Sequence, residues 1–243
     1  MKGCMPKLTL VLLLTVACSR SLFGQSLPER FDWEGSAFAG VSFVGTRNFS
    51  TSVSGSAQET SRTVGVHYAP GYQIGLRLKE NLGGEYWGAD LEYSFANQPL
   101  RLTNLTPSIQ NLPLGQSIHQ FSYSVSYTAF SPADRLRPYF KVGAGTSLFY
   151  IHGDSKDEAL RLGVALEDSW KFAVNWGGGL TYRFDDQSAF TFDFKDQLTG
   201  LPSYGLPSVT RVVNGLYEPG VSRSGLLHNV QFKIGGSFQW DWW

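Results

Sequence analysis

The histidines are the first residues to test for catalytic chemistry. An acyl hydrolase carried on strands would show a His-x-Ser pair with an acidic partner, because serine needs an adjacent base to become a nucleophile. Neither His119 nor His228 is followed by serine at that spacing, and His67 and His152 lack it too. The sequence also contains no nucleophile-elbow, P-loop, HExxH or EF-hand pattern. It therefore predicts a protein that is not an enzyme and that holds no metal ion and no cofactor.

A second set of reactive side chains consists of charges spaced two residues apart on either side of a turn. Arg77 and Lys79 approach the turn at residues 81–84, and Asp90 and Glu92 follow it. In neighbouring strands such residues share one face, so they are close enough to pair. Five further charges extend this set: Lys141, Arg183, Asp193, Lys195 and Lys233.

These charges would lie in the interior of the fold if their face were the inner one. An unpaired buried ion costs several kcal/mol, so they are expected to pair as a structural ion network. A gated pore in which the pairs exchange remains an alternative. A catalytic pair of carboxylates is disfavoured, because Asp90 and Glu92 both have cationic partners within reach.

Alternation of apolar and polar residues predicts the elements that position these charges. Residues 228–243 alternate almost to the end, which is typical of a strand with one apolar and one hydrophilic face. Strands of this kind are longer than those of soluble proteins and match the ~9–11 tilted residues that cross a bilayer. The pattern predicts eight strands, at residues 34–45, 67–79, 86–96, 117–130, 138–150, 170–184, 189–199 and 226–240.

Long and short connections alternate between these strands. Such a rhythm places all long loops at one end and all tight turns at the other, as in an antiparallel up-and-down transmembrane β-barrel. The fold class is therefore predicted to be all-β, with eight strands in that arrangement.

Alternation alone does not decide which face of the barrel is inside. A soluble, lipocalin-like ligand-binding barrel would turn the apolar face inward, around a ligand. However, eight strands enclose little more than side chains, and small polar residues fit there better than many rings. We therefore expect the apolar face to contact lipid. Phe38 is an exception, because its parity places its ring on the polar face.

The amino-terminal region predicts the compartment. Residues 8–17 form an apolar run after two lysines, too short for a transmembrane helix but typical of a secretory signal. We expect a signal peptide over residues 1–24 and the barrel over 25–243. Cys4 and Cys18 both lie in the signal region, so no disulfide is expected, although residues 15–18 leave lipidation of Cys18 as an alternative. Lys and Arg balance Asp and Glu at 20 each, which argues against nucleic acid as a partner.

With these features the chain resembles the small eight-stranded outer-membrane barrels of the outer membrane protein A and outer membrane protein X type. The resemblance rests on the signal, the loop rhythm, the alternation and the closing strand with Phe238, Trp240 and Trp242. It implies a location in the outer membrane of a Gram-negative-type bacterium, contact with lipid, and recognition of the closing aromatics by the barrel-assembly machinery. It also implies a structural role or recognition of a surface ligand through the long loops, expected at residues 46–66, 97–116, 151–169 and 200–225. A narrow pore for small solutes is the alternative function.

Overall fold

The structure is a computed structural model, and it describes residues 32–54, 60–82, 86–131, 134–213, 216–221 and 225–240. The expected signal peptide over residues 1–24 and the aromatic residue Trp242 lie outside this range. Among the described residues, no helix has the length and apolar character needed to cross a membrane.

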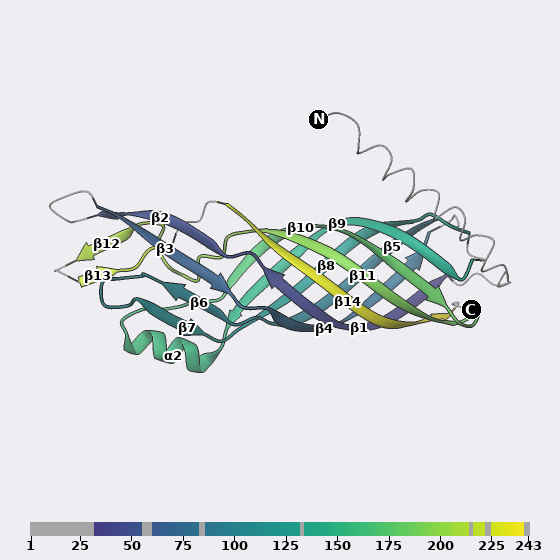
Figure 1. Cartoon of the computed structure of the whole chain (residues 1–243), viewed down its shortest axis with the longest axis horizontal. Helices are drawn as coiled ribbons and strands as arrows, with labels where there is room; N and C mark the ends of the chain where they lie inside the picture. The colour runs from purple at the N-terminus through teal and green to yellow at the C-terminus, as the bar shows by residue number, and fades with distance from the viewer. Residues whose placement is uncertain are drawn as a thin grey trace, which may run out of the picture.

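Eight long antiparallel strands form a closed barrel in the order β1-β14-β11-β10-β9-β8-β5-β4 (Figure 1). The barrel closes because β1 pairs with β14 on one side and with β4 on the other. The strands are β1 (Trp33–Val44), β4 (Gly71–Asn81), β5 (Trp87–Asn97), β8 (Gln116–Thr128), β9 (Leu136–Ile151), β10 (Ser169–Arg183), β11 (Ser188–Gly200) and β14 (Leu226–Trp240). The predicted fold class is confirmed, and the bounds agree to within a few residues except at the second strand. There the prediction merged the end of one strand with the start of the next.

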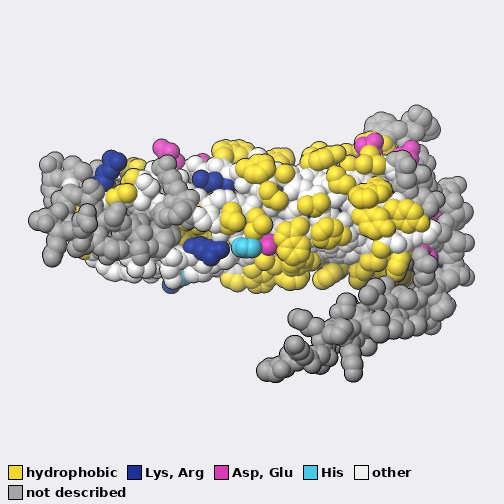
Figure 2. All heavy atoms as spheres, turned by 90° about the horizontal axis from the view of Figure 1, so that it is seen from above, with side chains coloured by type: hydrophobic (Ala, Val, Ile, Leu, Met, Phe, Trp, Pro, Cys, Tyr) yellow, Lys and Arg dark blue, Asp and Glu magenta, His cyan; other side chains and the backbone are white. Residues whose placement is uncertain are grey.

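The apolar face of the barrel points outward. Leu76 and Ile234 are both 63% exposed, and Phe192 is 52% exposed, whereas Ser124 and Lys233 are buried in the lumen. Figure 2 shows apolar side chains gathered over the barrel strands, as contact with hydrocarbon requires. The soluble ligand-binding barrel, which would bury these rings around a ligand, is therefore excluded.

Phe38 lies inside the barrel, as its parity predicts, because two glycines make room for its ring. A Cβ on Gly75 would lie 2.3 Å from Phe38 Cζ, and one on Gly235 would lie 2.9 Å from Phe38 Cβ. Both glycines are Cα partners of Phe38, on the strands to either side. The ring in turn lies beneath Lys233, whose Nζ is 4.5 Å from the ring centroid.

The long connections do not remain loops: three of them build a second sheet beyond the barrel (Figure 1). Its order is β13-β12-β2-β3-β6-β7, and β12 pairs in parallel with β2, far away in the chain. The strands are β2 (Arg47–Ser54), β3 (Thr60–Tyr68), β6 (Leu100–Thr103), β7 (Asn111–Leu114), β12 (Thr210–Val213) and β13 (Leu216–Glu218). The remaining long connection forms the helix α2 (Gly153–Arg161). The description of these segments as loops is corrected; we call the six strands the outer sheet.

One apolar core joins the outer sheet to the mouth of the barrel. Inward residues at the ends of barrel strands pack with the inner face of the outer sheet and with residues from the segments between them. The core includes Val44, Ile118, Phe149, Ile151 and Leu227 from the barrel, and Val64, Val66, Tyr68, Leu100, Leu102, Leu112 and Leu114 from the outer sheet. Because this core is continuous, the outer sheet is fixed to the barrel and does not hang from it on loops.

Candidate functional site

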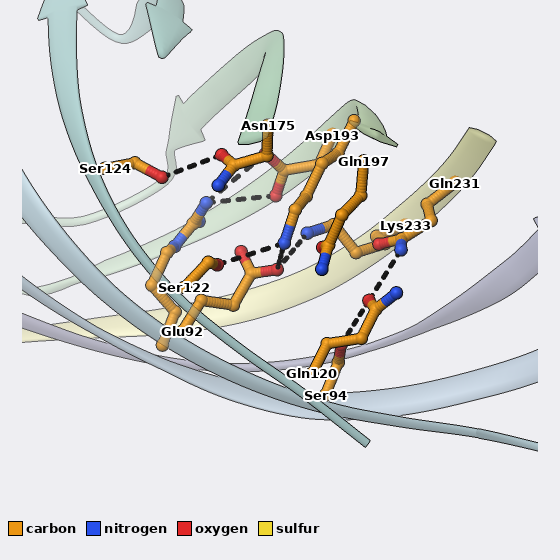
Figure 3. A network of polar contacts seen from close by, with 12 residues as sticks. Glu92, Ser94, Gln120, Ser122, Ser124, Asn175, Asp193, Gln197, Gln231 and Lys233 are labelled. Atoms are coloured by element: carbon orange, nitrogen blue, oxygen red, sulfur yellow. Dashed lines mark hydrogen bonds and ion pairs between the residues drawn. The ribbon is translucent and has the colours of Figure 1, made fainter. Parts of the chain in front are cut away.

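The centre of the lumen holds a cluster of ions around one carboxylate (Figure 3). Glu92 on β5 accepts hydrogen bonds from three lysines, each on a different strand: Lys141 Nζ at 3.1 Å, Lys195 Nζ at 3.0 Å and Lys233 Nζ at 2.8 Å. All four side chains are 3% exposed or less. The cluster therefore ties β5 to β9, β11 and β14 across the interior.

A second carboxylate completes the cluster. Asp193 Oδ2 lies 3.1 Å from Arg77 NH1, and its Oδ1 lies 3.5 Å from Lys141 Nζ. Asp193 also accepts a hydrogen bond from the hydroxyl of Tyr139. Lys141 thus bridges the two carboxylates, so no charge of the cluster stands without an opposite one.

The register of β4 and β5 places Arg77 opposite Glu92 and Lys79 opposite Asp90. These opposite residues do not form the ion pairs that the structure shows. Arg77 pairs with Asp193, because Glu92 is already surrounded by three lysines that would repel a guanidinium. Asp90 is buried and Lys79 is partly exposed, and no ion pair between them is found in the described part of the chain. The expected cross-strand pairing is therefore wrong in its partners.

Arg183 lies outside this cluster, beside the short turn between β10 and β11. Its NH2 donates to the backbone carbonyl of Asp186 at 2.5 Å. In the same turn, the Asp185 carboxylate accepts backbone N–H bonds from Gln187 at 2.9 Å and Ser188 at 2.6 Å. These bonds lower the pKa of Asp185, since they favour the charged carboxylate. Arg183 therefore belongs to the turn and not to the lumen cluster.

Of the three closing aromatics, Phe238 and Trp240 lie on β14, at the end of the barrel that carries the short turns. Phe238 is 51% exposed on the outer surface. Trp240 pairs in register with Trp33 at the start of β1 and packs against Gly35, where an added Cβ would lie 3.0 Å from its ring. The Trp240 ring therefore packs across the seam between the first and last strands.

Nearer the outer sheet than the ions, a layer of amides and hydroxyls fills the lumen; Figure 3 shows Ser94, Gln120 and Gln231 of this layer beside the ion cluster. Gln120 Oε1 accepts from Gln231 Nε2 at 2.7 Å and from Ser94 Oγ at 3.0 Å. Gln197 Nε2 donates to Ser147 Oγ at 2.8 Å. The sequence predicts that these residues lie on the polar face of their strands, but it does not predict the hydrogen-bonded layer that they form.

Two tyrosine hydroxyls form a hydrogen-bonded chain inside the apolar core, between that layer and the outer sheet. Tyr68 OH lies 2.9 Å from Tyr204 OH, and Tyr204 OH donates to Gln116 Oε1 at 2.7 Å. Tyr204 has a positive φ of 51°, so the chain turns sharply to place this ring in the core. Burial raises the pKa of both tyrosines, because it disfavours the phenolate.

Each of the four histidines has a side-chain partner that no sequence motif indicated. The pairs are His67–Thr103 at 3.4 Å, His119–Tyr93 at 2.9 Å, His152–Ser117 at 2.8 Å and His228–Asp196 at 2.9 Å. The Ser117–His152 pair has the spacing of a nucleophile and its base, but Ser117 is 4% exposed, beneath the start of α2. This pair therefore joins β8 to the segment before α2 without offering an open nucleophile.

The fold is similar to solved structures. The crystal structure of Neisserial surface protein A superposes with a TM-score of 0.51 at 9% sequence identity, over 86% of this chain and 97% of that chain. Two others are the N-terminal β-barrel domain of Pseudomonas aeruginosa OprF (TM-score 0.40, 13% identity, 86% and 98% covered) and Ail, the attachment invasion locus protein of Yersinia pestis (0.39, 11%, 86% and 99%). At these identities the likeness concerns the fold alone.

The sequence itself identifies the family. Among curated proteins, none matches the chain in sequence. The family model described as outer membrane protein beta-barrel domain matches residues 10–203, which is most of the chain. The outward apolar face of the barrel, its closure and this match agree, and the chain belongs to the outer membrane protein beta-barrel domain family of the Gram-negative outer membrane.

Proposed function

We propose that this protein is a non-enzymatic, non-conducting membrane anchor that holds the outer sheet at the cell surface for recognition of a surface partner. In barrels of this architecture the long connections face outside and the short turns face the periplasm. The outer sheet, built from those long connections, is then the part that meets other molecules.

The continuous apolar core carries this proposal. Val66 of the outer sheet and Ile118 of the barrel belong to one buried cluster, so the sheet has a fixed position relative to the membrane. Preorganised surfaces bind with a smaller loss of conformational freedom than mobile loops do. A rigid platform of this kind suits recognition better than it suits passage of a solute.

The contents of the lumen support a barrel that does not conduct. A solute would have to pass the ion cluster around Glu92, the amide layer around Gln120 and then the apolar core. Side chains from different strands contact one another directly in each layer, and moving one of the buried ions out of its pairs is costly. The gated pore has no comparable observation in its favour.

Two further partners form part of the proposal. Outer-membrane lipid surrounds the outward apolar face of the barrel, which includes Leu76 and Phe192, both more than half exposed. The barrel-assembly machinery would recognise the end of β14, with Phe238 and Trp240 on it. Trp242, the third residue of that expected signal, lies outside the described residues.

Two measurements test the proposal. In planar bilayers, we expect the refolded protein to give no steady conductance, and regular open channels would favour the pore. For orientation, Ser208→Cys in the connection before β12 and Glu80→Cys near the first short turn are a matched pair of exposed positions. On intact cells a membrane-impermeant maleimide should label the first variant and not the second. The reverse labelling pattern would show that the outer sheet does not lie at the cell surface, and it would contradict the proposed function.

A further inference from the structure

A groove of about 630 Å3 lies at the junction of the outer sheet and the barrel. It follows β3, β6 and the end of β7, and its floor includes Tyr68, Leu100 and Leu114 of the apolar core. Its lining includes His67, Arg101, Thr103, Pro113 and Gly115. None of these residues belongs to the lumen cluster, so the groove is a separate site.

Three polar atoms converge at the upper end of this groove because Gly65 has no side chain. A Cβ on Gly65 would lie 2.4 Å from Thr103 Oγ1, 2.5 Å from His67 Nε2 and 2.8 Å from Asn48 Oδ1. Thr103 Oγ1 and His67 Nε2 are themselves 3.4 Å apart. The glycine therefore allows groups from β2, β3 and β6 to meet on one surface.

Arg101 is the charged side chain among the described residues that line the groove, and the strands of the groove carry no carboxylate. Arg101 is exposed and is the Cα partner of His67, so the two lie side by side. The strands β2, β3, β6 and β7 contain no Asp or Glu within their bounds. In the described part of the chain, Arg101 forms no ion pair. A cation kept free beside hydrogen-bonding groups favours an anionic ligand.

The height of the groove places it at the edge of the bilayer. Ala69 N–H donates to the carbonyl of Pro99 at 2.9 Å, where β3 and β6 leave the barrel. Directly below, Tyr72 is 58% exposed and accepts a hydrogen bond from Asn97 Nδ2 at 3.2 Å. A tyrosine with its ring outward and its hydroxyl bonded is typical of the membrane–water interface. Arg101 follows Asn97 by four residues, about 13 Å of extended chain, so it lies above the tyrosine on the headgroup side of the interface.

From these observations we propose that the groove binds the phosphomonoester of an outer-leaflet lipid headgroup. The guanidinium of Arg101 matches phosphate oxygens with two parallel N–H donors, which lysine does not offer. His67 and Thr103 supply further donors to the same group, and Gly65 leaves room for these two side chains to lie together. This inference rests on the proposed function, because it needs the outer sheet to lie outside the membrane.

The test compares phosphorylated and phosphate-free probes on the refolded full chain in maltoside detergent. The probes are lipid A with its two phosphates, the same glycolipid with the phosphates removed, and soluble glucosamine 6-phosphate. The variants are Arg101→Gln and, as a matched control, Arg211→Gln, an exposed arginine on β12 of the same sheet. We expect Arg101→Gln to weaken binding of the phosphorylated lipid by about tenfold, the usual effect of one lost charge-assisted contact, and Arg211→Gln to leave it unchanged.

Gly65→Ala offers a second route, because the new methyl group would displace His67 and Thr103 without changing any charge. Gly65→Ala should weaken binding of the phosphorylated lipid. The wild-type protein and this variant should both keep the heat-dependent gel mobility of a folded barrel. Equal losses in the two arginine variants, or equal binding of both glycolipids, would overturn the site. If glucosamine 6-phosphate bound as tightly as the phosphorylated lipid, the groove would still be a phosphate site, but its assignment to a lipid headgroup would be overturned. None of these results alters the maleimide pattern or the conductance, so failure here differs from failure of the proposed function.

Discussion

Glu92 Oε1 lies 3.0 Å from Lys195 Nζ although β5 and β11 stand on opposite sides of the barrel, four positions apart in its closed order. Strands so far apart share no backbone hydrogen bonds. The contact exists because the lumen of a small barrel is narrow enough for two long side chains to span it. Lys141 and Lys233 reach the same carboxylate from other strands, so one residue connects four of the eight strands.

Replacing Glu92 with glutamine should therefore destabilise the barrel strongly. It leaves three buried lysines facing a neutral amide, and breaking a buried ion pair from one side costs about 3–5 kcal/mol. Urea unfolding in lipid vesicles, followed by the gel mobility of unheated samples, measures the loss. Glu80→Gln, at an exposed position near a short turn, is the control and should change stability by less than about 0.5 kcal/mol. Similar midpoints for the two variants would show that Glu92 does not organise the lumen.

Phe38 gives a second prediction, because its apolar ring lies among polar neighbours inside the barrel. Phe38→Leu removes the contact with Lys233 and leaves a gap beside Gly75, since leucine does not reproduce the shape of the ring. We expect a loss of about 1–3 kcal/mol, combining the cation–π contact and the poorer packing. Phe192→Leu is the control: its side chain is 52% exposed to lipid, which accommodates either shape. The same unfolding assay compares the two, and a smaller cost at Phe38 than at Phe192 would contradict the structure.

The barrel could be predicted from the sequence because lipid and lumen impose a period of two on every spanning strand. Residues such as Leu76 and Arg77 must face opposite environments, and no other arrangement satisfies both. The outer sheet could not be predicted in this way. Strands of four residues, such as β6 and β7, offer too few positions to show a period, and β12 finds its partner β2 in a distant part of the chain.

The inward position of the charges could be predicted from the same period of two as the strands. The partner of each charge could not. Parity along a strand places Arg77 in the lumen, whereas its choice of Asp193 depends on the diameter of the closed barrel and on competition at Glu92. Likewise, the sequence separates Ser117 from His152 by 35 residues, and the register of β8 with β9, which places Gln116 opposite Ile151, brings them together. Contacts of this kind depend on tertiary geometry and leave no local pattern.

Tyr204 connects the outer region to the barrel and gives a third prediction. In Tyr204→Phe, Gln116 Oε1 loses its donor inside the apolar core, which costs about 1–3 kcal/mol for a buried acceptor. The loss should be local, because the ion cluster below is untouched. Hydrogen exchange should then show faster opening of β3, which contains Tyr68, with little change in β10 or β14. Tyr182→Phe, in the lipid-facing row of β10, is the control and should leave every strand unchanged.

The same two tyrosines predict how stability depends on alkaline pH. Burial raises the pKa of Tyr68 and Tyr204 above the value of about 10 for unfolded tyrosine, so the folded chain holds these protons more tightly than the unfolded chain does. Their contribution is fully present below pH 10, and stability falls as the pH rises beyond it, because the unfolded state then releases protons first. Absorbance at 295 nm should show two tyrosinates appearing late, together with the loss of near-ultraviolet circular dichroism. In the double variant Tyr68→Phe/Tyr204→Phe this late step should vanish, and its persistence would show that other tyrosines are responsible.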